Sequence, residues 1–114
     1  MRLLASKVAL FAEALLAYRI EYSPDAEEHL QALTARQRAK ALDNVDKKLT
    51  RQPAVETKNC RPMRPNPVAP WELRIGKLRV YYDVEDQPEP VVHVLAVGIK
   101  RRNLVRIGRE VIRL

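Results

Sequence analysis

The sequence predicts a small α+β domain, in which an N-terminal strand and a helical hairpin pack on one face of a mainly antiparallel sheet. Three observations predict this fold. Two helix starts follow each other closely, a glycine separates two alternating segments, and one segment is apolar almost throughout, as in a central strand. With 114 residues, 46% of them hydrophobic, the chain can form one core but not two domains.

The first 17 residues differ from the rest, and we assign them to an N-terminal extension, expected to be helical, ahead of a domain spanning 18–114. The extension is too short to span a bilayer of about 30 Å, and charged residues interrupt its apolar run. We therefore expect neither a membrane anchor nor a signal peptide, but a helix that packs on the body or on a second copy, or a segment without a function of its own. Its apolar helical face consists of Leu4, Val8, Phe11 and Leu15.

The domain is expected to begin with a short strand, because apolar and polar residues alternate over Tyr18–Tyr22. Ser23 and Pro24 then have the features of a helix cap and a first helical position. A second helix starts at Thr34, where the order Thr-Ala-Arg-Gln has the form of a capping box, and ends before Pro53. The residues expected to face the sheet are Ala26, Leu30 and Leu33 in the first helix and Leu42, Val45 and Leu49 in the second.

Five prolines between residues 53 and 70 predict an irregular loop without a regular element. The next segment, Trp71–Val84, alternates on both sides of Gly76-Lys77, which predicts a hairpin with Arg74 directly opposite Arg79. Because facing like charges destabilise a sheet, we expect this pair either at a solvent-exposed edge or around an anion.

A turn over residues 86–90 is expected to lead into a strand at Val91–Ile99 that is buried on both faces. In the tail that follows, Ile107-Gly108-Arg109 predicts a turn into a last short strand, which covers a sheet edge or makes a dimer contact. This tail, residues 100–114, carries six basic side chains against Glu110 and so supplies +5 of the net charge of +7.

The basic charge suggests contact with a polyanion. Alternate side chains leave a strand on opposite sides, so Arg74, Arg79 and Tyr81 are expected on the sheet face away from the helices, beside the basic tail. Cys60 is the only cysteine and the chain has two separated histidines, so we expect no disulfide, metal or other cofactor and a cytoplasmic location.

The segments YRIEYSPDAEEHLQAL, WELRIGKLRVYYDV and VVHVLAVGIKRR resemble the RelE/ParE family of bacterial type II toxins over residues 18–102. This resemblance implies the RelE-like fold and a cognate antitoxin protein as partner. The expected assembly is either a homodimer of this chain or a hetero-oligomer of toxin and antitoxin. RelE-like members are ribosome-dependent endoribonucleases that cut mRNA and inhibit translation, whereas ParE-like members poison DNA gyrase. We expect the first activity, with mRNA and the ribosome as partners; gyrase poisoning or an inactive antitoxin-binding relic are the alternatives.

In the RNA-cleaving branch, basic residues hold the scissile phosphate while the RNA 2′-hydroxyl attacks it without a metal. By motif position, the resemblance implies catalytic roles for Arg74, Arg79 and Lys100. Glu72 stands where that branch often has a lysine, and no tyrosine follows the last strand, so Tyr81 is the expected substitute in proton transfer. A phenol with a pKa of about 10 needs cationic neighbours for that role. The residues expected to bind the RNA backbone are Lys58, Arg61, Arg64, Arg101 and Arg102.

Overall fold

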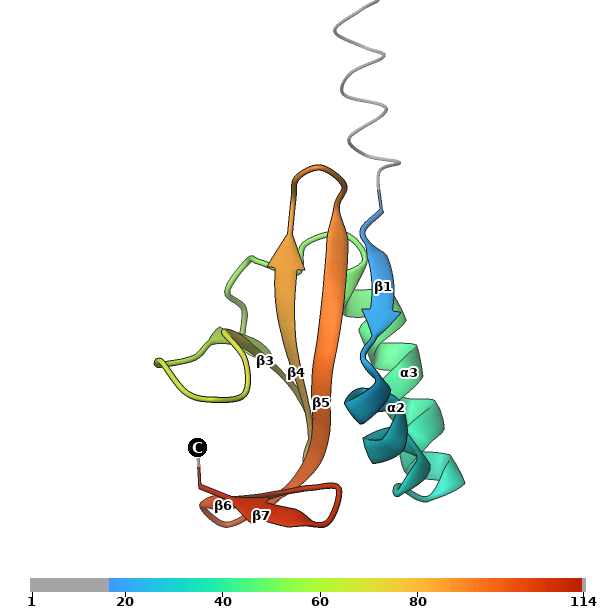
Figure 1. Ribbon diagram of the computed structural model, residues 1–114, viewed down its shortest axis with the longest axis vertical. Coiled ribbons are helices and arrows are strands. Elements are labelled where there is room, and N and C mark those ends of the chain that lie inside the picture. The colour runs from blue at the N-terminus through green and yellow to red at the C-terminus, as the bar shows by residue number, and fades with distance from the viewer. Residues whose placement is uncertain (1–16, 114) are drawn as a thin grey trace, which may run out of the picture.

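The computed structural model describes residues 17–113, which form two helices and a seven-stranded sheet (Figure 1). The predicted helical extension lies, apart from Ala17, outside the described residues. The α+β fold is as the sequence predicts, and the predicted helices and strands follow each other in the expected order, with two further short strands at Cys60–Pro62 and Leu104–Ile107. The elements are β1 (Arg19–Tyr22), α2 (Pro24–Gln31), α3 (Ala35–Leu49), β2 (Cys60–Pro62), β3 (Trp71–Ile75), β4 (Leu78–Glu85), β5 (Val91–Arg101), β6 (Leu104–Ile107) and β7 (Glu110–Ile112).

The two helices begin where the sequence predicts them. The Ser23 hydroxyl accepts a hydrogen bond from the backbone of α2, and Thr34 and Gln37 form the capping box of α3. One inward residue was predicted wrongly: Leu42 is 37% exposed, and Ala41 is buried in its place. The buried stripe of α3 runs through positions 41, 45 and 49 at a spacing of four, and Leu42 lies about 100° away from it around the helix.

The sheet has the order β2-β3-β4-β5-β6-β7 with antiparallel neighbours, and β1 pairs with β5 in parallel. The predicted hairpin is confirmed, because β3 and β4 meet at Gly76-Lys77 and Gly76 has a φ of +57°. The prediction of a loop without regular structure is wrong at β2, which adds three residues to the edge of β3. Pro62 ends this short edge strand, a position in which a missing N–H is tolerated.

Strand β5 has three successive partners along one edge. Residues 91–94 pair with β1, and residues 98–101 pair with β6. Between them, α2 and its N-cap residue supply side chains: the Ser23 hydroxyl donates to the Leu95 carbonyl, and His29 Nδ1 accepts from the Val97 N–H at 3.2 Å. A bulge at this point lets Leu95 and Ala96 share the place opposite Tyr81.

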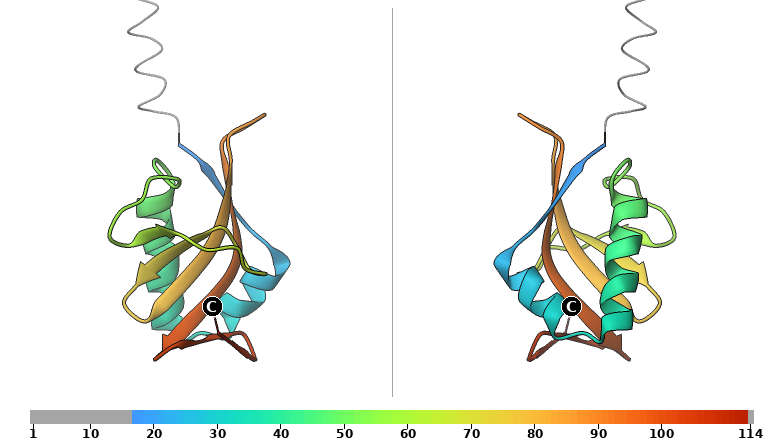
Figure 2. Two further views of the ribbon diagram at one scale, coloured as in Figure 1. Left: turned by 90° about the vertical axis from the view of Figure 1, so that its left-hand side faces the viewer. Right: turned by 90° about the vertical axis from the view of Figure 1, so that its right-hand side faces the viewer.

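Each face of the sheet is covered by different parts of the chain. The helices pack on one face around Leu73, Val80 and Tyr82. On the other face, the proline-rich loop and the β6–β7 hairpin form a smaller cluster around Tyr81. The loop lies on the side away from the helices in Figure 1 and crosses in front of the sheet in the left view of Figure 2. The second face, expected to be open, is therefore covered over Tyr81.

The tail forms the predicted last turn and short strand. β6 extends the sheet beside β5, and β7 folds back beside β6 after Gly108, whose φ is +62°. This hairpin crosses the end of the sheet that lies opposite the 86–90 turn (Figures 1 and 2). Val105 and Ile107 are buried in the second cluster, so the tail covers a sheet edge, as one of the two expected roles requires.

Candidate functional site: a basic groove on the second face of the sheet

The facing arginines of the hairpin each have a separate acceptor. Arg74 and Arg79 are opposite each other in the register, as predicted. Arg74 Nε lies 2.7 Å from a Glu72 carboxylate oxygen, whereas Arg79 Nη1 donates to the carbonyls of Gly76 and Leu78 at 2.6 and 2.8 Å. The two guanidinium groups thus bind local acceptors, and no bound anion is needed to hold them in register.

A groove of about 600 Å³ opens beside Arg74, between the proline-rich loop, the end of β5 and the tail. Five cationic side chains and a single carboxylate line it. Cations gathered around one groove repel each other, and an anionic partner relieves that repulsion. Its charged residues are Arg61, Arg64, Glu72, Arg74, Lys100 and Arg113.

Glu72 is the only charged residue within residues 17–113 that is buried, with 8% of its surface exposed. A carboxylate that leaves water to this degree needs a cationic partner and further donors. Its hydrogen bond to Arg74 Nε supplies the partner and leaves both terminal nitrogens of that guanidinium without a hydrogen bond to the described residues. Arg74 can therefore offer a two-pronged donor set to an oxyanion in the groove.

The structure corrects the environment expected for Tyr81. Its ring is on the predicted face but has no exposed surface, because the proline-rich loop and β6 cover it. Burial raises the pKa of the phenol, and the charge of Glu72 raises it further, against an opposing effect of Arg79. A phenol with a raised pKa keeps its own proton near neutral pH and is not available as a base, so the cationic neighbours do not give Tyr81 the property that its expected role requires.

The groove brings together only part of the predicted site. Arg74 and Lys100 line it with Arg61 and Arg64, whereas Arg79 and Tyr81 are outside its lining. The backbone-binding candidates Lys58, Arg101 and Arg102 are outside it as well. Sequence reasoning missed Arg113 and gave Glu72 no role. The spacing of two between Glu72 and Arg74 on one strand was the available signal, because it places both side chains on the same face.

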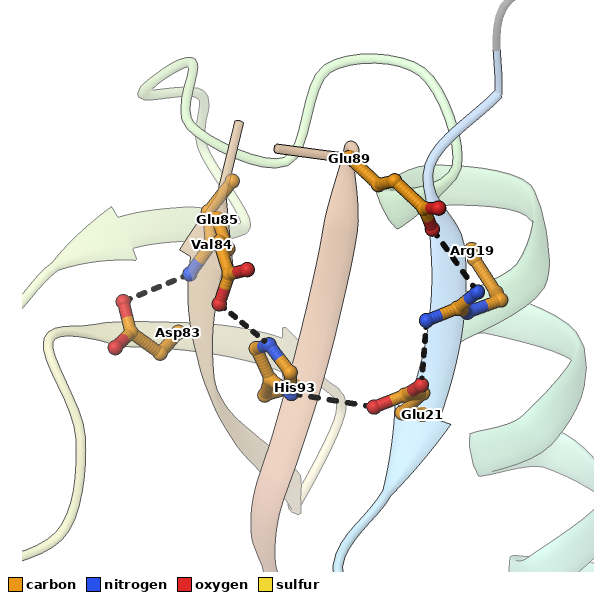
Figure 3. Close-up of polar contacts among 7 residues, drawn as sticks. All are labelled: Arg19, Glu21, Asp83, Val84, Glu85, Glu89 and His93. Atoms are coloured by element: carbon orange, nitrogen blue, oxygen red, sulfur yellow. Dashed lines mark hydrogen bonds and ion pairs between the residues drawn. The ribbon is translucent and has the colours of Figure 1, made fainter. Parts of the chain in front are cut away.

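A second polar cluster occupies the same sheet face near the 86–90 turn (Figure 3). Arg19 bridges Glu21 and Glu89, at 2.7 and 3.2 Å. The half-buried His93 has one ring nitrogen 3.5 Å from Glu21 and the other 3.3 Å from Glu85. Exposed pairs of this kind contribute little individually, on the order of 1 kcal/mol or less. These contacts connect β1 with β5 and connect β5 with β4. They also make this end of the sheet face acidic, whereas the end with the groove is basic.

Within residues 17–113, no group of three or more His, Cys, Asp or Glu side chains is arranged to hold a metal ion. No helix in the same range is both long and apolar enough to cross a membrane.

Comparison with known proteins adds two findings. Residues 20–104 match the family described as the ParE toxin of the type II toxin–antitoxin system parDE. Among solved structures, the fold is similar to a chain in the toxin–antitoxin complex RelBE2 from Mycobacterium tuberculosis, with a TM-score of 0.65 and 22% identity. That similarity covers 75% of this chain and 93% of the other. No curated protein matched the sequence.

Proposed function

Because the chain belongs to the ParE toxin family of type II toxin–antitoxin systems, we propose that it arrests growth by binding DNA gyrase through the basic groove, without cutting nucleic acid. The target would present phosphate or carboxylate oxygens to Arg74, Lys100 and their neighbours. Guanidinium groups suit this task because their planar donor pairs match the oxygens of both anions.

The position of Arg79 and Tyr81 supports binding over cleavage. RNA cleavage by 2′-hydroxyl attack needs a group that takes the hydroxyl proton and a cation that stabilises the phosphate. The resemblance implies the second role for Arg79, and Tyr81 was the expected substitute in the first, yet both are outside the groove. The one carboxylate lining it, Glu72, is already bonded to Arg74. Arg79 Nη1 is likewise bonded to the hairpin turn.

We further propose that the cognate antitoxin silences the chain by covering the groove with acidic side chains. The similarity to a chain of a toxin–antitoxin complex supports a protein partner of this kind. The five cations of the groove provide the complementary charge.

Ribosome-dependent cleavage of mRNA is the second candidate, and a specific observation favours it. Arg74 and Lys100, two of the residues implied for catalysis, do line one groove together with the predicted backbone-binding residues Arg61 and Arg64. An mRNA strand held there would have its phosphates among four of the predicted cations.

The two candidates differ in what they leave in the cell. The experiment is induced expression without antitoxin, with transcript 5′ ends mapped, beside a supercoiling assay of gyrase with the purified chain. We expect growth arrest, loss of supercoiling activity and no new transcript ends. New ends that disappear in the Arg74→Ala/Lys100→Ala variant would instead establish mRNA cleavage. Harmless expression of the folded chain would identify an inactive relic.

A further inference from the structure

Two buried donors on β4 lack partners. Among the described residues, the Tyr81 hydroxyl and Arg79 Nε are the only buried side-chain nitrogen or oxygen atoms without a hydrogen bond. They are two residues apart on the same strand face. Unpaired buried donors cost free energy, so two of them side by side indicate an acceptor that reaches them in another state of the molecule.

The nearest acceptor group is on the neighbouring strand. Glu72 is directly opposite Tyr81 in the register, as Arg74 is opposite Arg79. Directly paired residues have Cβ atoms about 4.5–5.5 Å apart, which is within reach of a carboxylate. The Glu72 carboxylate is close enough to Tyr81 for both its charge and its contact with the phenol to raise the pKa of Tyr81. The Tyr81 hydroxyl nevertheless completes no hydrogen bond with it, while one Glu72 oxygen is bonded to Arg74.

We propose that Glu72 takes the place of an anionic ligand on Arg74: when a phosphate group binds Arg74, the carboxylate turns to the buried donors of Tyr81 and Arg79. Without this movement, the phosphate and the carboxylate would compete for one guanidinium and repel each other. The inference rests on the proposed use of the groove for anion binding. It makes Glu72 and Tyr81 positioning residues, which act on the ligand only through Arg74.

The hydroxyl of Tyr81 then favours the state that binds the ligand. A ligand shifts an equilibrium only by the difference in its affinity for the two states, so stabilising the turned carboxylate raises the observed affinity. Tyr81→Phe retains the ring but removes the donor. We expect the affinity for a phosphodiester to fall about tenfold, the effect of one hydrogen bond to a charged acceptor.

The test is a double-mutant cycle with a fluorescein-labelled single-stranded RNA and a DNA of the same sequence, each followed by fluorescence anisotropy at low salt. Tyr81→Phe is expected to weaken binding in the wild-type background and to have no effect in the Glu72→Gln background. Tyr82→Phe is the matched control, because this phenol is on the opposite face and bonds to Pro53. Glu72→Ala provides a second background without the carboxylate. The two nucleic acids distinguish the source of the phosphodiester.

The outcomes separate this inference from the proposed function. If Tyr81→Phe leaves the affinity unchanged, or lowers it equally with and without the Glu72 carboxylate, the movement of Glu72 is overturned while anion binding stands. If the wild-type chain binds neither oligonucleotide, the groove does not take a phosphodiester and the movement of Glu72 is overturned, whereas binding of gyrase is judged separately by the supercoiling assay. A tenfold loss of affinity from Tyr81→Phe that occurs only when Glu72 is present supports the movement of the Glu72 carboxylate.

Discussion

At the scale of single residues, two adjacent tyrosines show how burial and pairing differ. Tyr81 and Tyr82 are both without exposed surface, but they belong to the clusters on opposite faces of the sheet. Tyr82 donates a 2.7 Å hydrogen bond to the Pro53 carbonyl, whereas the Tyr81 hydroxyl has no partner. The same substitution at neighbouring positions should therefore have different effects on stability.

Tyr82→Phe is expected to lower the free energy of unfolding by about 1 kcal/mol, because the Pro53 carbonyl loses its donor. Tyr81→Phe is expected to leave it unchanged or to raise it slightly, because no hydrogen bond is lost. Urea denaturation of both variants measures the difference. Equal destabilisation would contradict the hydrogen-bond assignment of these two phenols.

His29 provides a hydrogen-bond acceptor for the backbone of β5, a role that the sequence alone does not indicate. Its Nδ1 accepts the Val97 N–H at the bulge of β5, where no strand provides a carbonyl. His29→Ala should cost about 1–3 kcal/mol, the effect of leaving a buried donor unpaired. His29→Asn places an acceptor at a similar distance from the backbone and should recover part of the loss. Equal losses in the two variants, measured by thermal unfolding, would assign the effect to packing instead.

At the scale of elements, the loop that covers Tyr81 is closed by a backbone hydrogen bond from Met63 N–H to the Pro70 carbonyl and held inside that closure by one side chain. The Asn66 amide oxygen accepts from the N–H groups of Val68 and Ala69, and its amide nitrogen donates to the carbonyls of Arg64 and Ala69. Side-chain bonds of this kind replace those of a regular element.

Asn66→Ala is expected to loosen the loop and expose Tyr81 without unfolding the sheet. Hydrogen exchange should accelerate for the Val68 and Ala69 amides while the β4–β5 amides stay protected. Asn44→Ala is the control, since that side chain bonds only within α3, to Lys40. Unchanged exchange at residues 68 and 69 would show that the prolines alone fix the loop.

The sequence predicted those elements whose signals are local. The hairpin register followed from Gly76 and the alternation around it, and α3 followed from its capping box. β2 was not predicted because its pairing depends on β3, which begins nine residues after β2 ends, and because prolines surround it. Leu42 was misplaced because helical spacing alone does not distinguish two adjacent stripes, and packing against the sheet selects Ala41.

At the scale of the whole molecule, the site was harder to predict than the fold. Strand parity placed Arg74 correctly, and the end of β5 placed Lys100. The groove also needs Arg61 and Arg64 from the loop and Arg113 from the tail, and their convergence depends on how both segments fold over the sheet. The same covering segments bury Tyr81, and no local pattern in the strand predicts this.

The stability of the whole domain is expected to fall at alkaline pH. All four tyrosines have a raised pKa in the folded chain, Tyr81 and Tyr82 mainly through burial. A raised pKa contributes stability below the unfolded value of about 10, and this contribution is lost as the pH rises above it, because the unfolded chain ionises first. Urea midpoints should drop less steeply in the Tyr81→Phe/Tyr82→Phe variant. An identical drop would assign the alkaline loss to other groups.

Toxicity that acts through the basic groove should depend on the charges of the groove and not on the total charge, so growth is compared between two variants that each lose two cations. Arg74→Ala/Lys100→Ala removes two cations from the groove, and Lys48→Ala/Arg51→Ala removes two exposed cations at the end of α3. Each variant is expressed without antitoxin at equal protein level. We predict that the groove variant no longer arrests growth and that the α3 variant arrests it like the wild type. Equal arrest by both variants would show that toxicity does not act through the groove.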